Sequence, residues 1–541
     1  MAGWNFAELW EAIADKFPDA QAQVHGDQRY TWKEFDSRAD GLAAHLLAGG
    51  AVHSDKVALY LYNCPEYMEG CYGAFKAGMV PVNTNYRYLD DELVYLWDNA
   101  DAVAVVFHGC FTDRVAAVKS KLSKVRQWIW VDDGSDSCPD WATDYEVVAA
   151  SAAGRVIPPW GRSGDDVVMI YTGGTTGMPK GVMWRQDDLI GVTCATGNPM
   201  LAKDPAEVGG VAAFIDGIAA PGAPGLPACP LMHGTGWFTA NIFLTQAGSV
   251  VTLTDRSLDW TEVLDAIERE RVGALTIVGD AFGKPMVRAL DANPDKWDLS
   301  SLVLVASSGV MWSEPVKEAM LAHNPTMLLI DTFSSSEAIG MGSSVSAGDS
   351  AEKTAHFALG PGCKVFDDTG SPVAAGSGER GRVAVPGRVP IAYYKDPVKS
   401  ADTFIEHDGV RYSMPGDYAT VEADGTITLL GRGSVCINTG GEKVFPEEVE
   451  EALKTDPGVA DAVVVGVPDE KFGEAITAVV EMLPGSTLDE AALIAHVKGH
   501  LAHFKSPKRV LGIDTIGRAP NGKVDYKRLK AYAMDELGID A

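Results

Sequence analysis

Residues 171–182 read YTGGTTGMPKGV and directly follow the apolar run at 167–170. Glycines after a strand allow a tight turn and expose successive backbone N–H groups, which can hold an anion. The threonine hydroxyls add hydrogen-bond donors and Lys180 adds a positive charge. The stretch therefore predicts a strand followed by a loop suited to nucleotide phosphates.

The loop differs from the familiar Walker A pattern. That pattern requires Gly-Lys followed by Ser or Thr, whereas Lys180 is followed by Gly181. Taken alone, the loop leaves a purely structural tight turn open as an alternative. Its meaning depends on the rest of the chain.

Length and composition indicate a folded protein with more than one domain. The chain has 541 residues, 46% of them hydrophobic and 22% charged, which is too long for one ordinary core and too apolar for a disordered chain. Its formal net charge of −29 argues against a nucleic-acid-binding protein, because such a protein presents a basic face to phosphates. An acidic chain that binds a polyanion must use a few placed cations.

Several sequence features predict a cytoplasmic protein without integral membrane association. The opening MAGWNFAELWEAIADKF lacks the basic and apolar regions of a signal peptide. No apolar run approaches the roughly 18–20 residues of a membrane helix. The eight cysteines are scattered without a C-x-x-C pair, so we expect reduced thiols.

The N-terminal part of the chain alternates between helical and extended patterns. Thr31 and Glu34 have the spacing of a capping box, which predicts that a helix begins at residue 32. Such alternation predicts parallel sheets covered by helices. The periodicity of apolar residues predicts strands at 57–62, 80–83, 102–107 and 127–131 and helices at 66–77, 90–97 and 113–122.

The C-terminal part has a different organisation. The stretch GDYATVEADGTITLLGRG at 416–433 predicts short strands joined by a turn at Asp424 and Gly425. Beyond it, helices at 446–453 and 489–501 and strands at 460–467 and 475–481 form a self-contained set. We therefore expect an N-terminal domain over 1–430, a hinge at 431–434 and a small domain over 435–541. Residues 209–230, rich in Gly, Ala and Pro, are predicted to form a long loop.

Further motifs follow the loop in a fixed order. They are PLMHG at 230–234, FSSSE at 333–337, PGD at 415–417, the region from Gly431-Arg432 to GGEKVFPEEVE at 440–450, and PNGK at 520–523. Together with TGGTTGMPKGV, this set resembles the adenylate-forming enzymes, the superfamily of acyl-CoA synthetases, adenylation domains and firefly-type luciferases. The likeness covers essentially the whole chain. Gly173 stands where that family usually has serine.

The resemblance implies a fold and a reaction. The fold is α/β, with a large N-terminal domain of parallel and mixed sheets, packed helices and a β-rich part, and a small mobile α+β C-terminal domain. In the reaction a carboxylate and ATP give an acyl-adenylate and pyrophosphate, and a thiol then displaces AMP. A carboxylate must approach a polyanion in the first step, so catalysis is mostly charge neutralisation and positioning.

The resemblance also assigns roles to residues. The implied catalytic residues are Lys523, Glu337, Thr176 and His233. Glu337 is expected to help place Mg²⁺, and His233 to lie against the reacting carboxylate and help gate the thiol channel. Phe333 is expected to stack on adenine. The residues implied to bind ATP or coenzyme A are Thr172, Gly173, Gly174, Thr175, Thr176, Gly177, Lys180, Ser308, Gly309, Asp331, Thr332, Phe333, Ser334, Ser336, Asp417, Arg432, Asn438, Gly440, Gly441 and Lys523.

In this family the small domain turns between the two steps. Lys523 would neutralise charge during adenylation, and Gly440 and Gly441 would then line the pantetheine channel. The hinge falls at Ser434, where many relatives carry aspartate or lysine. Asn438 stands where lysine is common, so the sequence leaves the roles of Ser434 and Asn438 open.

The acid substrate has two candidate classes. The amino-acid sequence of the motifs, for example YTGGTTGMPKGVMW at 171–184, is most similar to that of steroid side-chain fatty-acid–CoA ligases of sterol-degrading bacteria. A medium- or long-chain fatty acid is the alternative. The sequence leaves open whether residues 209–230 border the acyl pocket. It also leaves open whether the chain forms a homo-oligomer.

Two other functions share much of this pattern. A carrier-protein loading enzyme uses the same first step, but the chain shows no appended carrier domain with its D-S-L serine. An inactive architectural protein would be free to lose the charged motif residues, yet all are present: Lys180, Glu337, Asp417, Arg432 and Lys523. The expected partners are therefore a small carboxylic acid, ATP and coenzyme A.

Overall fold

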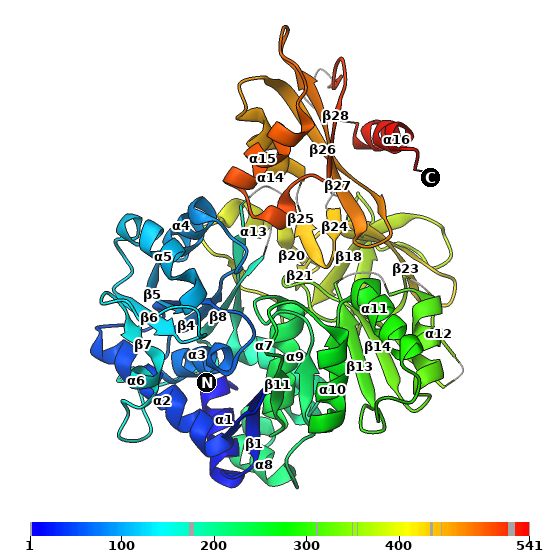
Figure 1. Cartoon of the computed structure of the whole chain (residues 1–541). Helices are drawn as coiled ribbons and strands as arrows, with labels where there is room; N and C mark the ends of the chain where they lie inside the picture. Colours follow the sequence, from blue (N-terminus) through cyan, green and yellow to red (C-terminus); the bar gives the residue numbers. More distant parts are fainter. Residues whose placement is uncertain are drawn as a thin grey trace. The chain divides into compact units, whose positions relative to one another are not determined.

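A computed structural model describes residues 3–172, 178–309, 312–348, 350–353, 355–432, 437–444, 446–517 and 525–539. The chain forms two compact units (Figure 1). The larger consists of Met1–Tyr86, Val94–Tyr171 and Gly181–Leu430, and the smaller of Arg87–Leu93, Thr172–Lys180 and Gly431–Ala541. Residues 433–436 lie outside the described part, so the hinge at 431–434 stays a prediction.

An eight-stranded sheet of the larger unit leads into the predicted phosphate loop. Every neighbouring pair from β8 to β7 in this sheet is parallel, and helices between the strands supply the crossovers that parallel pairing requires. Those helices include α3 (Pro65–Lys76), α4 (Asp90–Asn99) and α5 (Thr112–Val118). The strands are, in spatial order, β19 (Ala392–Tyr393), β9 (Lys180–Arg185), β8 (Val167–Thr172), β4 (Val80–Asn83), β3 (Lys56–Tyr60), β5 (Ala102–His108), β6 (Gln127–Val131) and β7 (Thr143–Asp144).

A second, fifteen-stranded sheet is parallel from β1 to β14 and antiparallel beyond β14. The antiparallel part is the β-rich region that the sequence predicted. Its strands are, in spatial order, β2 (Gln28–Thr31), β1 (Gln21–His25), β11 (Val250–Thr252), β10 (Gly225–Pro227), β12 (Ala274–Ile277), β13 (Leu304–Ser308), β14 (Leu328–Phe333), β15 (Gly342–Ala347), β16 (His356–Leu359), β23 (Ile427–Arg432), β22 (Asp417–Val421), β18 (Arg380–Pro386), β21 (Val410–Ser413) and β20 (Phe404–His407), with β17 (Lys364–Phe366) beside β18.

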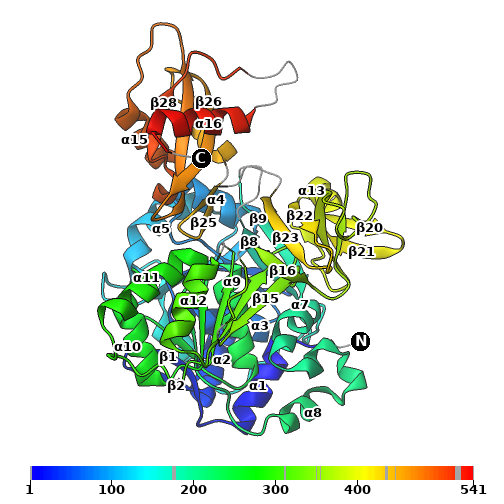
Figure 2. The same ribbon diagram turned by 90° about the vertical axis from the view of Figure 1, so that its right-hand side faces the viewer.

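An aromatic core joins helices from distant parts of the larger unit. Phe6 of α1 (Phe6–Lys16) stacks on Phe75 of α3 at 5.0 Å and meets Trp237 of α9 (Gly234–Thr245) edge-on at 6.1 Å. Trp10 of α1 contacts Tyr72 of α3 at 5.2 Å. A separate apolar cluster packs α10 (Trp260–Glu270), α11 (Gly279–Ala292) and α12 (Glu314–His323) against β12, β13 and β14 (Figures 1 and 2).

The smaller unit has its own sheet and core. The sheet order is β25 (Glu442–Val444), β24 (Ile437–Thr439), β27 (Gly473–Met482) and β26 (Val459–Asp469), with β28 (Arg509–Gly512) parallel to β27. The helices α14 (Pro446–Lys454), α15 (Glu490–His500) and α16 (Tyr526–Leu537) contribute buried apolar residues to it. The predicted α/β fold class, with a small α+β C-terminal part, is therefore confirmed.

Most predicted elements agree with the structure, and one region does not. Thr31 caps α2 (Trp32–Ala48) in a full capping box with Glu34. Residues 209–230 were predicted to be a long loop, which is wrong in two places. Gly210–Gly217 forms α8, because Phe214 packs against Trp4 at 6.1 Å, and Gly225–Pro227 forms β10 of the large sheet.

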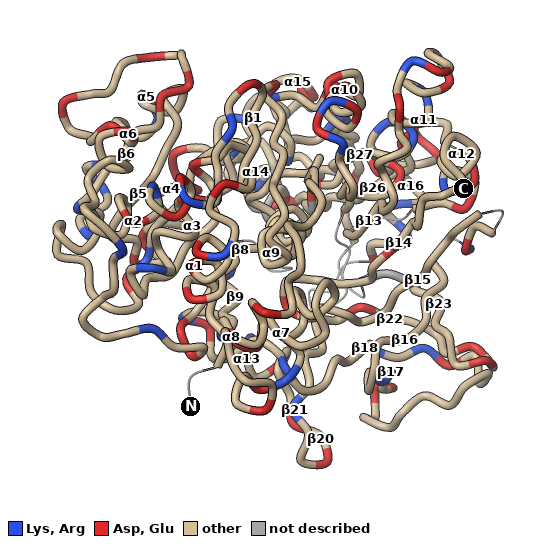
Figure 3. Tube along the Cα trace, turned by 90° about the horizontal axis from the view of Figure 1, so that it is seen from below, with Lys and Arg blue, Asp and Glu red and all other residues tan. Residues whose placement is uncertain are grey.

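The described cysteines are free thiols, as expected. Across the described ranges, no helix is both long and apolar enough to cross a bilayer. Figure 3 shows Asp and Glu spread along the trace with Lys and Arg between them, rather than gathered in one acidic segment. The net charge of −29 is therefore distributed along the chain.

A buried lysine holds three helices together at the base of the larger unit. Lys76 of α3 is fully buried and lies 2.8 Å from Glu11 of α1 and 2.8 and 2.9 Å from Asp36 and Asp40 of α2. Burial raises the pKa of Asp40, and the Lys76 ammonium opposes that rise. Arg162 and Arg155 also pair with Glu11 and Asp36, at 2.7 and 3.2 Å, so removal of the Lys76 ammonium falls most heavily on Asp40, which loses its ion pair to Lys76.

We predict that Lys76→Met destabilises the larger unit by about 3–5 kcal/mol, because removing one partner of a buried ion pair leaves uncompensated charge. Urea unfolding followed by tryptophan fluorescence measures the loss. Lys124→Met is the control: Lys124 also bridges two carboxylates, Asp98 and Asp101, but it is exposed, so we expect a loss below about 1 kcal/mol. Equal losses in the two variants would contradict the argument.

Candidate active site

The strand before the phosphate loop is fixed by burial on both sides. Val168, Met169, Ile170 and Tyr171 of β8 are buried. A side chain at Gly181 of β9 would come within 2.8 Å of the Met169 sulfur, which explains the glycine after Lys180. Thr172 and Lys180 bound the loop, whereas Gly173, Gly174, Thr175, Thr176 and Gly177 lie outside the described residues.

His233 stands at the start of α9. It is the N-cap residue of this helix, with extended backbone angles, and its N–H donates to the Pro230 carbonyl at 3.1 Å. A β-carbon at Gly236 would lie 2.5 Å from that same carbonyl oxygen. The turn from Pro230 to His233 therefore packs directly against the first turn of the helix, which only glycine permits at residue 236.

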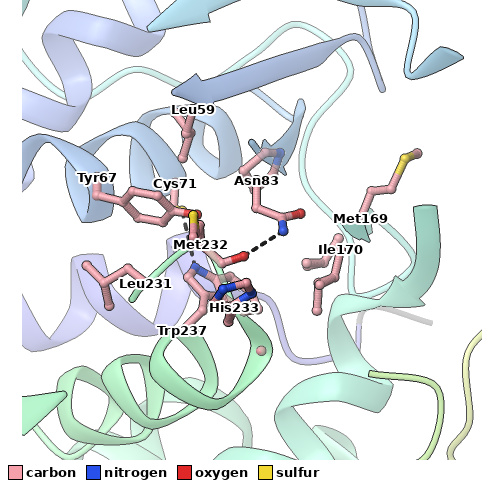
Figure 4. A pocket seen from close by; sticks show the side chains of 13 residues that line it. Leu59, Tyr67, Cys71, Asn83, Met169, Ile170, Leu231, Met232, His233 and Trp237 are labelled. Carbon is pink, nitrogen blue, oxygen red and sulfur yellow. Dashed lines mark hydrogen bonds between the residues drawn. The ribbon is translucent and has the colours of Figure 1, made fainter. Parts of the chain in front are cut away.

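A small cavity opens beside His233. It is lined by α3, the ends of β4 and β8, and the start of α9, with Cys71, Asn83, Ile170, Met232 and Trp237 among its walls (Figure 4). Its interior has room for about one or two waters. Burial raises the pKa of the Cys71 thiol to about 12, so this wall is uncharged.

The ends of β13 and β14 form a second part of the site. Ser308 donates its hydroxyl to the Thr332 carbonyl at 2.8 Å, and Thr332 returns a bond to the Ser307 carbonyl at 2.9 Å. Gly309 follows with a φ of +95°. A β-carbon on Gly309 would lie 3.9 Å from the Thr235 hydroxyl of α9, so this loop and the helix start are neighbours.

Asp331 and Phe333 alternate with Thr332 along β14 and are buried. The Asp331 carboxylate lies 3.5 Å from the ammonium of Lys317 on α12. Burial raises the pKa of Asp331 to about 6, while Lys317 opposes that rise. Phe333 contacts Phe357 at 5.7 Å within the core of the β-rich part.

Glu337 follows β14 in a tightly bonded loop. Glu337 is 5% exposed as a residue, and its carboxylate accepts a hydrogen bond from the Tyr393 hydroxyl at 3.0 Å. Its carbonyl accepts one from Ser413 at 2.6 Å. The Trp184 indole donates to the Ser336 carbonyl at 2.9 Å, and Ser334 accepts from the Gly340 N–H at 3.0 Å.

The start of α9 brings these segments together. The Ser336 hydroxyl lies 3.3 Å from where a β-carbon on Gly234 would stand. His233, Ser336 with Glu337, and Gly309 with Ser308 therefore surround one helix start. Asp417 is buried at the first residue of β22, after Gly416 with φ +101°. Arg432 ends β23.

In the smaller unit, Gly440 and Gly441 form the turn of the β24–β25 hairpin. Both have positive φ, +59° and +83°, which a two-residue hairpin turn with this twist requires. Asn438 of β24 donates its backbone N–H to Glu474 at 2.9 Å. Lys523 and Ser434 lie outside the described residues.

Sequence reasoning missed several residues that shape the site: Tyr393, Trp184, Asn63 and Asn83. For Asn83 a signal existed, because it is a polar residue at the carboxyl end of a predicted parallel strand, where ligands gather. Tyr393 and Trp184 come from β19 and β9 and gave no sequence signal, since aromatic residues in strands are ordinary core residues.

The chain matches two family descriptions. Residues 10–394 match "AMP-binding enzyme" and residues 448–523 match "AMP-binding enzyme C-terminal domain". The chain belongs to the AMP-binding enzyme family. It is an AMP-forming acid–thiol ligase, with ATP and coenzyme A as co-substrates.

Individual relatives are similar over nearly their full length. A medium/long-chain-fatty-acid–CoA/3-oxocholest-4-en-26-oate–CoA ligase of Mycobacterium tuberculosis is 41% identical, over 97% of this chain and 95% of that protein. A 3-oxocholest-4-en-26-oate–CoA ligase of Rhodococcus rhodochrous is 39% identical, over 99% of this chain and 96% of the relative. The amide bond synthetase McbA of Marinactinospora thermotolerans shares the fold, with a TM-score of 0.78 at 23% identity over 97% of this chain and 99% of that one.

Gly309→Ala tests whether the β13 loop serves the nucleotide. The left-handed φ should cost about 1–2 kcal/mol for any residue with a β-carbon, and the shifted loop should weaken ATP binding. Thermal unfolding and titration calorimetry with ATP measure the two effects.

Gly425→Ala is the matched control, because Gly425 has φ +86° at a hairpin tip with nothing close to its missing β-carbon. It should lose similar stability and keep the ATP affinity of the parent protein. If both variants bind ATP equally well, the loop after β13 does not contact the nucleotide.

Proposed function

We propose that this ligase makes the coenzyme A thioester of a steroid side-chain carboxylic acid, with medium- and long-chain fatty acids as the second candidate class. The observation that carries the site is the convergence of His233, Ser336–Glu337 and Ser308–Gly309 on the start of α9. The substrate class is supported by the names of the relatives. A panel of steroid side-chain, fatty and aryl acids, assayed by AMP release with free coenzyme A, tests both candidates.

In the first step a carboxylate oxygen of the acid attacks the α-phosphorus of ATP. The new C(O)O–P bond forms as the bond to the β-phosphate oxygen breaks, and pyrophosphate leaves with that electron pair. The loop from Thr172 to Lys180 would hold the β- and γ-phosphates through its N–H groups and its lysine. Lys523 would stabilise the charge that develops on the attacked phosphate oxygens.

In the second step the coenzyme A sulfur attacks the acyl carbon of the mixed anhydride. The C–S bond forms, the C–O bond to AMP breaks, and the thiol proton passes to solvent. His233 would border the reacting carbon and the thiol path. This step expels AMP rather than joining two anions, so it needs less positive charge than the first.

The described side chains fit a magnesium ion held mainly by nucleotide phosphates. In the described part of the chain there is no cluster of three His, Cys, Asp or Glu for a metal. Such a cluster is unnecessary, because Mg²⁺ is commonly held by one or two carboxylates plus substrate phosphates. Glu337 supplies one carboxylate, oriented by Tyr393. When bound, the ion would neutralise phosphate charge.

The apolar cavity beside His233 supports an apolar acyl group. Its walls include Leu59, Val168, Leu231 and Trp237, so the part of a substrate that enters it must be uncharged. With room for only about one or two waters, it accepts more than a methyl-sized group only if a wall moves. The helix α8 instead packs on the N-terminal segment, so we do not assign residues 210–217 to the acyl pocket.

We also propose a cytoplasmic location, which suits ATP and coenzyme A as co-substrates and the free thiols of the described part. A carrier-protein loading enzyme is the alternative of a different class. Release of AMP with free coenzyme A, in the absence of any carrier protein, would exclude it.

Glu337→Gln should slow adenylation by roughly 100- to 1000-fold, because a preorganised electrostatic group of this kind contributes about 2.7–4 kcal/mol. Higher Mg²⁺ should recover part of the loss. Pyrophosphate exchange into ATP measures the rate. Tyr393→Phe keeps the carboxylate and removes only its hydroxyl partner, so we expect a much smaller effect; a parental rate in Glu337→Gln would exclude the metal role.

Lys523→Ala should remove most ATP-dependent acyl-adenylate formation while leaving coenzyme A attack on supplied acyl-adenylate largely intact. A cation that stabilises the first transition state more than the ground state has no counterpart in the second step. Quench-flow measurement of each half-reaction separates the two. Lys527→Ala, an exposed lysine of α16, is the control, and a joint fall of both steps in Lys523→Ala would contradict the two-orientation mechanism.

A further inference from the structure

Two asparagine side chains tie the turn before His233 to the eight-stranded sheet. The turn Cys229–Met232 follows β10 of the other sheet. Asn63, just after β3, accepts from the Leu231 N–H at 2.7 Å and donates to the Cys229 carbonyl at 3.1 Å. The backbone of the turn is therefore hydrogen-bonded to a side chain that follows a strand of the other sheet.

Asn83 makes a second link, and it reaches two segments. Its Nδ2 donates to the Met232 carbonyl at 2.6 Å and to the Tyr171 carbonyl at 2.9 Å. Its Oδ1 accepts from the Tyr171 N–H at 2.7 Å. Figure 4 shows this amide beside His233 on the wall of the cavity. Tyr171 directly precedes Thr172, where the predicted phosphate loop begins.

This pattern requires an amide. β4 pairs with β8 at Val82 and Met169, and beyond that pair the Asn83 side chain bonds the N–H and carbonyl of Tyr171 as a neighbouring peptide would. A primary amide has two donors and one carbonyl acceptor. Aspartate would keep the acceptor, lose both donors and place a negative charge beside two carbonyl oxygens.

We propose that Asn83 is a positioning residue of the ligation reaction. Its side chain fixes the position of the strand before the phosphate loop relative to the turn before His233. The activity readout of this proposal rests on the proposed function, whereas its structural readout does not. The adenylation step must align a carboxylate with the α-phosphate. Its rate is therefore sensitive to the relative position of these two segments, because a displacement of about 1 Å can cost roughly 100-fold in rate.

The test compares Asn83→Asp with a matched control, Asn324→Asp. Asn324 has the same bonding pattern, donating to the Leu299 and Leu302 carbonyls and accepting from the Thr326 N–H. It is the C-cap residue of α12 and precedes β14, whose far end carries Phe333. Both changes replace an amide by a carboxylate, and only one touches the site.

Asn83→Asp should lower the turnover of pyrophosphate exchange by roughly 100-fold, with a smaller change in the KM for ATP. The turnover of Asn324→Asp, expressed per folded protein, should stay within about twofold of the parent. Burial beside two carbonyl oxygens should raise the pKa of the new carboxyl, so lowering the pH from about 8 to about 5.5 should raise the Asn83→Asp rate relative to the parent as protonation restores one donor. Asn324→Asp is measured over the same pH range, because a general loss of stability that protonation relieves would appear in that variant as well.

Hydrogen–deuterium exchange followed by mass spectrometry supplies the readout that does not need activity. We expect faster exchange in Asn83→Asp confined to peptides covering 167–172 and 229–234, and in Asn324→Asp confined to peptides around 299–302 and 324–328. If Asn83→Asp does not fold, Asn63→Asp replaces it, with the change expected at 229–234.

Each outcome decides a separate point. Asn83→Asp with parental turnover, or with exchange changes no more local than a general loss of stability, overturns the proposal. A parent protein without pyrophosphate exchange on any acid of the panel overturns the proposed function instead, and the exchange data then still decide whether Asn83 couples the two segments.

Discussion

The site depends on one close approach, that of the Pro230 carbonyl to the first turn of α9. A β-carbon at Gly236 would stand 2.5 Å from that oxygen, so the helix packs against the turn only because residue 236 has no side chain. In this position the helix start lies close to Gly309 and to Ser336. Segments that follow β10, β13 and β14 of the fifteen-stranded sheet thus meet at a helix start, where the backbone N–H groups and the helix dipole favour a negatively charged ligand.

The strongly negative net charge of the chain restricts how it can bind anionic co-substrates. A chain with a net charge of −29 repels ATP and coenzyme A at long range, and at physiological salt that repulsion is screened beyond about 8 Å. Binding must then come from short-range groups, and those proposed above are backbone N–H donors, Lys180 and, for the metal, Glu337. Tyr393 keeps the Glu337 carboxylate oriented in a place where it is almost fully buried.

Local signals in the sequence predicted local structure well. The Thr31–Glu34 capping box and the turn at Asp424 and Gly425 depend on neighbours in the chain, and each is present. The region 209–230 failed because its order comes from distant partners: α8 needs Trp4, and Gly225 of β10 must approach Phe243, whose ring a β-carbon would overlap. Asn63 was missed for the same reason, and although the place of Asn83 at the end of a predicted strand was a signal, its partners were not predictable, since each asparagine bonds a segment more than 80 residues away.

The asparagine links have a consequence for how the larger unit becomes functional during folding. Asn83 ends β4 of the eight-stranded sheet and Asn63 follows β3 of that sheet, whereas the turn that they hold follows β10 of the other, so these links form only when both sheets are present. A ligand that spans both adds its binding free energy only to the state in which the sheets are joined. Bound as proposed, the nucleotide would oppose separation of the two sheets and would serve as a temporary structural element of the enzyme that consumes it.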